Sequence, residues 1–182
     1  MSVSRDPLGA DAPPGDAPTD PVEVFRVLNS HDVDYLIIGG VAVQAYGHVR
    51  TTQDVDVVVA PDIPNLERLA AALGQLGARL KGVDAHLLGI DPTNAMHLRD
   101  GANFGLTTSA GGLDVWTDTA ALKGARSWDE MREQAVEANV GELFMRFVDR
   151  DDLIRMKLAA GRERDLQDIA VLTSQEGEPP PA

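Results

Sequence analysis

The segment that restricts the possible folds most is residues 35–59, YLIIGGVAVQAYGHVRTTQDVDVVV. Two apolar segments, a glycine pair and an acidic pair occur within this short stretch. Residues 35–38 are apolar and partly β-branched, which predicts a buried strand that ends at Gly39-Gly40. Residues 41–46 are expected to form one or two helical turns. The valines of residues 54–59 predict a second strand that begins with Asp54 and Asp56.

The sequence on both sides continues this alternation of strands and helices. Asp20 with Glu23, and Ser127 with Glu130, have the spacing of capping boxes, which begin helices. The first of these helices is expected to run to about Ser30. Further helices are expected at residues 66–76, 151–160 and 166–172, and strands at 86–90, 96–99, 104–108, 113–116 and 143–148. We therefore predict an α/β (α+β) fold with a central mixed β-sheet flanked by helices and with C-terminal helices.

Composition restricts the chemistry. The 182 residues include 43% apolar residues and carry a formal net charge of −13, which fits one acidic globular domain. We expect a flexible leader at residues 1–20, the domain at 21–172 and a flexible tail at 173–182. The chain has no cysteine and no apolar run of the ~20 residues that span a membrane, and its first residues lack the basic-then-apolar pattern expected of a secretory signal. We expect a cytoplasmic protein with no membrane partner, in which any metal is bound by oxygen ligands.

Asp54 and Asp56 carry the clearest chemical signal. Residues two apart on a strand project from the same face, so both carboxylates would lie side by side. Adjacent carboxylates repel unless a cation lies between them, and their hard oxygens suit Mg²⁺, or Mn²⁺ in its place, together with substrate phosphates. Asp114, on the predicted strand 113–116, would complete three carboxylates for phosphoryl transfer and accept the proton of an attacking hydroxyl. A solvated strand face is the structural alternative, and Asp118 competes with Asp114 for the third position.

Gly39 and Gly40 lie between the first strand and the following helix. Without side chains, they let backbone N–H groups approach an anion at a helix N-terminus, where a triphosphate would bind. A tight turn between strand and helix explains such a pair equally simply. Arg50, four residues before Asp54, has two interpretations as well: a contact to nucleotide phosphate or a surface position on a turn.

The order of these motifs resembles the minimal nucleotidyltransferases of the DNA polymerase β superfamily, in which a strand ending in Gly-Gly or Gly-Ser precedes Asp-x-Asp and a later strand aspartate. Residues 157–168, KLAAGRERDLQD, are similar to the Lys-x4-Arg-x-Lys-Asp-x-x-Asp motif of AbiEii-type toxins, which include the mycobacterial MenT toxins. The resemblance covers residues 22–172. The sequence departs from the pattern at Gly40, where many AbiEii-type proteins have serine, and at Arg164, which replaces lysine.

The resemblance implies a metal-dependent nucleotidyltransferase that releases pyrophosphate from an NTP. Asp168 would hold Lys157 by an ion pair or act as a base. Five residues would be catalytic, the first three also as metal ligands: Asp54, Asp56, Asp114, Lys157 and Asp168. Five would bind the nucleotide: Gly39, Gly40, Arg50, Lys157 and Arg162.

For toxins of this type the expected donor is CTP, and CMP is added to the 3′ end of the tRNA acceptor stem, which blocks translation. A cognate antitoxin protein would restrain the activity. Six basic residues would bind the tRNA phosphates. They are Arg146, Arg150, Arg155, Lys157, Arg162 and Arg164.

Two alternatives concern the acceptor and the activity itself. The acceptor could be a small molecule, as in aminoglycoside-modifying relatives, or a protein side chain, as in antitoxins that adenylylate their toxin. The net charge of −13 fits a cationic drug or a protein at least as well as tRNA. A catalytically inactive interaction module would have no reason to keep three mutually repelling carboxylates together.

Overall fold

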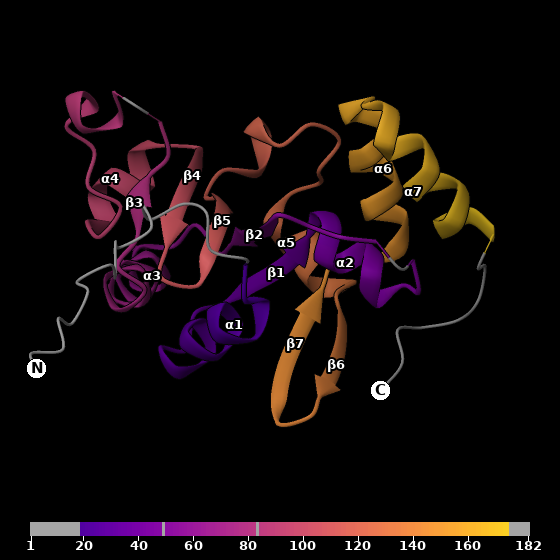
Figure 1. The fold of residues 1–182 in the computed structure, drawn as a ribbon, viewed down its shortest axis with the longest axis horizontal. Coiled ribbons are helices and arrows are strands. Elements are labelled where there is room, and N and C mark those ends of the chain that lie inside the picture. Colours follow the sequence, from indigo (N-terminus) through magenta and orange to yellow (C-terminus); the bar gives the residue numbers. More distant parts are fainter. Residues whose placement is uncertain (1–18, 49, 83, 175–182) are drawn as a thin grey trace, which may run out of the picture.

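The computed structural model describes residues 19–48, 50–82 and 84–174, which form a seven-stranded mixed sheet with helices packed around it (Figure 1). The strand order is β3-β4-β5-β2-β1-β7-β6. The helices are α1 (Pro21–Ser30), α2 (Gly39–Ala45), α3 (Ile63–Gln75), α4 (Ala95–Asp100), α5 (Trp128–Glu133), α6 (Arg150–Ala160) and α7 (Glu163–Ser174), with 3₁₀ turns η1 (Ala85–Leu88) and η2 (Thr119–Ala121). The strands are β1 (Tyr35–Ile38), β2 (Asp54–Val59), β3 (Arg79–Leu80), β4 (Asn103–Thr108), β5 (Gly111–Trp116), β6 (Val136–Val140) and β7 (Leu143–Phe147). The predicted fold class is confirmed.

The centre of the sheet is formed by β1, β2 and β5. β1 runs antiparallel to β2, with Ile38 opposite Asp56, and β2 runs parallel to β5, with Asp56 opposite Asp114. All four residues of β1 are buried, whereas β2 alternates between half-buried aspartates and buried valines at its start. This register brings the acidic residues of two strands to the end of β1, where the glycine pair begins α2.

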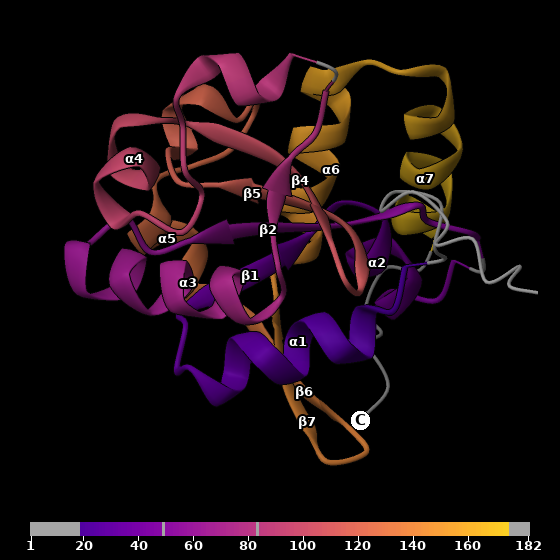
Figure 2. The ribbon, with the colours of Figure 1, turned by 60° about the vertical axis from the view of Figure 1, so that its left-hand side comes forward.

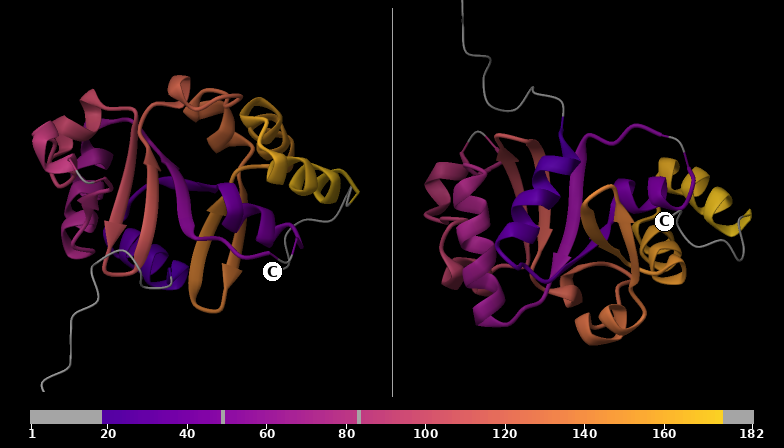
Figure 3. Two further views of the ribbon diagram at one scale, coloured as in Figure 1. Left: turned by 45° about the horizontal axis from the view of Figure 1, so that its top comes forward. Right: turned by 90° about the horizontal axis from the view of Figure 1, so that it is seen from below.

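Helices α1 and α3 pack together, and Figure 2 shows them side by side in front of the central strands. The capping box expected at the start of α1 is present in part, because the Asp20 carboxylate accepts a hydrogen bond from the Glu23 backbone N–H at 3.2 Å. Helices α6 and α7 pack against each other at the opposite end of the molecule from α3 and α4, and the hairpin β6–β7 projects from the body (Figures 1 and 3).

Two of the predicted strands are wrong. Residues 96–99 lie in helix α4, whose start is capped by Asn94 through a 2.9 Å hydrogen bond from the Met96 backbone N–H. Residues 86–90 overlap the 3₁₀ turn η1 and the irregular chain that follows it. Asparagine at a helix N-cap and the packing of α4 on α3 outweigh the short apolar pattern that indicated strands.

The structure also contains two strands that the sequence pattern did not predict. β3 has only two residues, and β6 exposes most of its side chains, with Ala138 as its one buried residue. β3 is too short to show any pattern. β6, VEANV, does alternate apolar and polar residues, but its five residues include only two valines and one alanine, and the sequence analysis did not assign it.

The expected leader lies outside the described residues except for Thr19 and Asp20, and the expected tail except for residues 173 and 174, which belong to α7. None of the helices in the described ranges is long and apolar enough to cross a membrane.

Candidate active site

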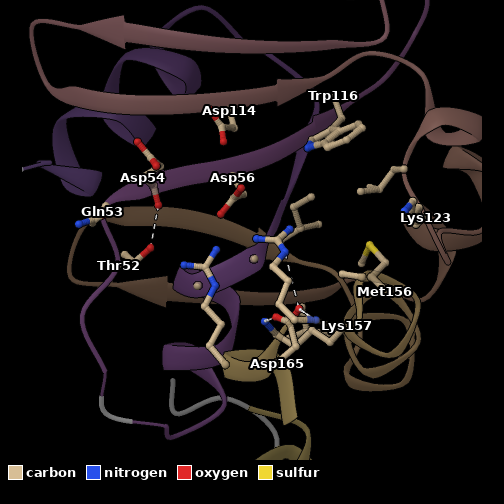
Figure 4. A pocket seen from close by; sticks show the side chains of 18 of the residues that line it. Thr52, Gln53, Asp54, Asp56, Asp114, Trp116, Lys123, Met156, Lys157 and Asp165 are labelled. Carbon is tan, nitrogen blue, oxygen red and sulfur yellow. Dashed lines mark hydrogen bonds and ion pairs between the residues drawn. The ribbon is translucent and has the colours of Figure 1, made fainter. Parts of the chain in front are cut away.

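Three carboxylates face one cavity from the central strands. Asp54 and Asp56 project from the same face of β2, and Asp114 lies beside Asp56 on β5 (Figure 4). Asp118, the competing candidate, instead caps the turn η2 by accepting a hydrogen bond from the Ala120 N–H at 2.8 Å. The structure therefore brings together the three carboxylates that the sequence analysis favours.

Glycines make the space for these carboxylates. Gly39 has φ +62°, a conformation that side chains disfavour, and a Cβ there would overlap the Asp56 carboxylate. A Cβ at Gly112 would overlap the Asp54 carboxylate in the same way. At Gly40 a Cβ would lie 2.5 Å from the Thr52 hydroxyl, so the serine that many AbiEii-type proteins have would not fit here without a shift.

The environment of Asp56 opposes its negative charge. Burial raises the pKa of Asp56 to about 6, and the charges of Asp114 and Asp54 add to this effect. A hydrogen bond from the Gly40 backbone N–H and the charge of Arg162 lower it in part. A nearby cation would stabilise the ionised form of such a carboxylate, as expected for a metal or substrate site.

Lys81 is a residue of this cluster that the sequence analysis missed. Its Nζ lies 2.8 Å from Asp54 Oδ1 and 3.1 Å from Asp114 Oδ1. Burial alone would lower the pKa of Lys81, but the hydrogen bonds and charges of both aspartates outweigh burial and raise it. No motif marks Lys81, because it follows the two-residue strand β3 and meets the aspartates only through the order of strands in the sheet.

A basic group lies across the cavity from the carboxylates. Lys157 is buried on α6, where its Nζ contacts Asp168 Oδ2 at 2.7 Å and Asp165 Oδ1 at 3.3 Å. Arg50 Nε lies 3.3 Å from Asp168 Oδ1 without the geometry of a hydrogen bond. The Asp168 carboxylate thus links the loop before β2 to α6, and His48 Nε2 lies 3.6 Å from it.

The cavity has a volume of about 730 Å³. Trp116, Leu122, Leu153 and Met156 give one part of its wall an apolar surface, and Lys123 and Arg164 lie among the lining residues as well. Of the residues expected at the site, eight line the cavity: Gly39, Gly40, Arg50, Asp54, Asp56, Asp114, Lys157 and Arg162. Asp168 does not line it and contacts Lys157 from behind, which favours the ion-pair role over that of a base.

The three carboxylates are the donor type that a hard divalent cation prefers, but they are not arranged as a formed metal site. Within the described ranges, no group of three or more His, Cys, Asp or Glu side chains is arranged to hold a metal ion. Two of the three carboxylates are instead bridged by the Lys81 ammonium, so a cation already lies between them. Carboxylate oxygens on rigid strands, completed by substrate phosphates and water, are the ligands that Mg²⁺ takes at nucleotide sites.

Residues 22–173 match a family described as nucleotidyltransferase of unknown function (DUF6036). The chain belongs to this nucleotidyltransferase family. No curated protein shows significant sequence similarity to this nucleotidyltransferase. The description of this family names no toxin, so the expected AbiEii or MenT type is not confirmed.

Solved structures share the fold of this nucleotidyltransferase. The lincosamide antibiotic adenylyltransferase LnuA, solved with lincomycin bound, is 17% identical with a TM-score of 0.57, over 87% of this chain and 99% of that chain. The antibiotic-resistance factor ANT(2'')-Ia is 15% identical with a TM-score of 0.57, over 86% and 82% of the two chains. An antigenic nucleotidyltransferase-like protein from Paracoccidioides brasiliensis is 18% identical with a TM-score of 0.55, over 91% and 82%.

Proposed function

We propose that this nucleotidyltransferase transfers a nucleoside monophosphate from an NTP to a hydroxyl of a small cationic molecule. The observation that carries the proposal is the meeting of Asp54, Asp56 and Asp114 with Lys157 and Arg162 on the walls of one cavity. Its volume of about 730 Å³ lies within the range of small-molecule sites.

In this reaction the acceptor hydroxyl oxygen attacks the α-phosphorus, and pyrophosphate leaves with the electrons of the broken P–O bond. Asp114 would accept the proton of the hydroxyl. Lys157 and Arg162 would neutralise the charge on the triphosphate, beside the backbone N–H groups of residues 39 and 40. A divalent metal held by Asp54, Asp56 and Asp114 would supply further neutralisation of the phosphate charge.

A cationic acceptor is supported by charge. Three carboxylates lie on one wall of the cavity, although the lining as a whole includes five basic residues, and the chain carries a net charge of −13, which attracts cations over long range. LnuA is a lincosamide antibiotic adenylyltransferase, solved with lincomycin bound, and ANT(2'')-Ia is an antibiotic-resistance factor, so a protein with this fold binds a small molecule elsewhere.

A tRNA-directed toxin that uses CTP and is held by an antitoxin is the second candidate. This candidate is favoured by Arg162 and Arg164. Both line the cavity, are exposed and could contact RNA phosphates. Four of the six basic residues pair with carboxylates nearby, however. Arg146 pairs with Asp34 and Glu137, and Arg155, Lys157 and Arg162 pair with other aspartates.

A labelling experiment separates these candidates. The purified chain is incubated with Mg²⁺ and each of the four α-³²P NTPs, together with aminoglycosides and lincosamides, total tRNA or cell protein. Label on a small cationic molecule, lost in Asp56→Ala, is the expected result. Label on tRNA or on protein would replace the proposed acceptor, and no label with any acceptor would contradict transferase activity on all of them.

A further inference from the structure

The chain has three lysines, and all of them lie at the active site. Lys123 and Lys157 line the cavity, and Lys81 reaches the carboxylates from the β3 side of the sheet. Thirteen of the 16 basic residues are arginines, so a lysine at each of these positions is a distinctive feature of the site. Only Lys81 touches the aspartates expected to bind metal.

The Lys81 side chain passes two glycines on its way to the aspartates, and the second of them, Gly112, leaves room for its ammonium. Lys81 donates its backbone N–H to Gly105 O at 2.8 Å, and its side chain then passes Gly105 on β4, where a Cβ would lie 3.6 Å from Lys81 Cδ. Its Nζ lies over Gly112 on β5, where a Cβ would be 3.3 Å away. The side chain thereby passes two strands and its ammonium reaches Asp54 on β2, and a side chain at Gly112 would crowd both Nζ and the Asp54 carboxylate.

The position of the ammonium conflicts with a bound divalent cation. Nζ lies within hydrogen-bond distance of one oxygen of Asp54 and one oxygen of Asp114. A metal ion on the same oxygens would lie within a few ångströms of the ammonium, and like charges at that separation repel. The side chain of Lys81 is 34% exposed, so it has room to move away.

We propose that Lys81 is a placeholder cation, which neutralises Asp54 and Asp114 while no metal is bound and is displaced when the metal binds. The inference rests on the proposed function, because that function places the metal on these carboxylates. Lys81 is then a positioning residue that keeps the three carboxylates together and weakens metal binding by competition.

The test is the affinity of the full chain for Mn²⁺ alone, without nucleotide, in wild type and Lys81→Met. Removal of the competing ammonium is expected to tighten Mn²⁺ binding about tenfold, which corresponds to the loss of two partly exposed ion pairs. Without metal, Lys81→Met should also melt at a lower temperature than wild type, and saturating Mn²⁺ should remove this difference. Lys81→Arg keeps a cation and should restore wild-type affinity.

Arg79→Gln is the matched control. Arg79 lies two residues earlier on β3, is exposed and carries the same charge, but within the described residues it forms no ion pair with Asp54 or Asp114. Its loss should leave Mn²⁺ affinity within twofold of wild type. An equal gain in both variants would show a general charge effect and overturn the proposal, as would unchanged or weaker binding in Lys81→Met.

Lysine acetylation gives a second readout that needs no variant. Mass spectrometry would follow the reaction of Lys81 and of exposed Lys123 with an acetylating reagent, with and without Mn²⁺. Displacement predicts that Mn²⁺ speeds acetylation of Lys81 several-fold and leaves Lys123 unchanged; an unchanged or slower Lys81 reaction would overturn it. If Mn²⁺ binds equally to both proteins, only the role of Lys81 fails, whereas no Mn²⁺ binding by either overturns the proposed metal-dependent function too.

Discussion

Burial and two acidic neighbours raise the pKa of Asp56 from 3.8 to about 6. The ionised form of Asp56 therefore lowers the free energy of unfolding. In the unfolded chain the group keeps its ordinary pKa, so between pH 4 and 6 the folded state binds the proton more strongly. Stability therefore falls as the pH rises through this window, and the whole penalty is present above pH 6.

Asp56→Asn should remove this penalty. We expect the metal-free variant to be about 2 kcal/mol more stable than wild type at pH 7.5 and equally stable near pH 4. Urea unfolding in EDTA at both pH values measures the difference. The same variant should lose nucleotidyl transfer. A variant less stable than wild type at pH 7.5 would show that the carboxylate contributes favourable contacts that outweigh its burial.

Single residues also show the limits of the sequence analysis. Asp54, Asp56 and the glycine pair could be placed because motif and strand period fix them locally. Lys81 could not, because its contacts depend on the position of β3 at the edge of the sheet. The close approach of Thr52 to Gly40 could not be predicted either, since the two residues meet only through the chain between α2 and β2.

At the scale of elements, Asp168 connects α7 to α6 by its contact with Lys157, and both side chains are buried. Asp168→Asn should lower the free energy of unfolding by about 2 kcal/mol, because a buried ammonium loses one of its two charged partners. The same change should raise the KM for NTP through misplacement of Lys157 and leave the pH profile of transfer unaltered. Urea unfolding and steady-state kinetics measure these effects.

The exposed Asp151 on α6 offers a control, since Asp151→Asn should change stability by no more than about 0.5 kcal/mol. A shifted pH profile in Asp168→Asn would instead indicate that Asp168 acts as a base.

Arg126 forms ion pairs that link the chain between β5 and α5 to helix α6. Its guanidinium contacts fully buried Asp152 at 2.6 and 2.7 Å and Asp149 at 3.2 Å. The connection carries Leu122 and Lys123 of the cavity wall. Arg126→Leu leaves a buried carboxylate without its partner and should lower the Tm by about 5–10 °C, as measured by circular dichroism.

Arg155→Leu is the matched control for this change. Arg155 approaches the same Asp152 only at 3.9 Å, and its side chain is half exposed. Its loss should shift the Tm by no more than about 2 °C, since exposed pairs contribute little. Equal losses in the two variants would show that the buried contact of Arg126 is not what fixes the connection.

Helices and strands that carry a strong local sequence signal could be predicted. Those whose local signal is weak or ambiguous could not. The capping box of α5 is complete, and the break between α6 and α7 occurs at Gly161 in the left-handed conformation, as expected. Residues 86–90 and 96–99 were assigned to strands wrongly, because short apolar segments do not distinguish a strand from a helix by pattern alone. The packing of α4 on α3 decides between them, and it is a tertiary interaction.

At the level of the whole molecule, the chain carries a net charge of −13, and its cavity has three carboxylates on one wall. Long-range attraction of a cationic acceptor is screened by salt, whose Debye length falls from about 10 Å at 0.1 M to about 3 Å at 1 M. At saturating NTP and Mg²⁺, kcat/KM for a cationic acceptor should therefore fall about five- to tenfold between 0.05 and 0.5 M NaCl.

The control is a neutral hydroxyl acceptor, whose kcat/KM should change by less than twofold. Circular dichroism at each salt concentration checks that the fold persists. A rate that rises with salt would contradict a cationic acceptor, whereas a loss of about a thousandfold by 0.2 M would point to nucleic acid.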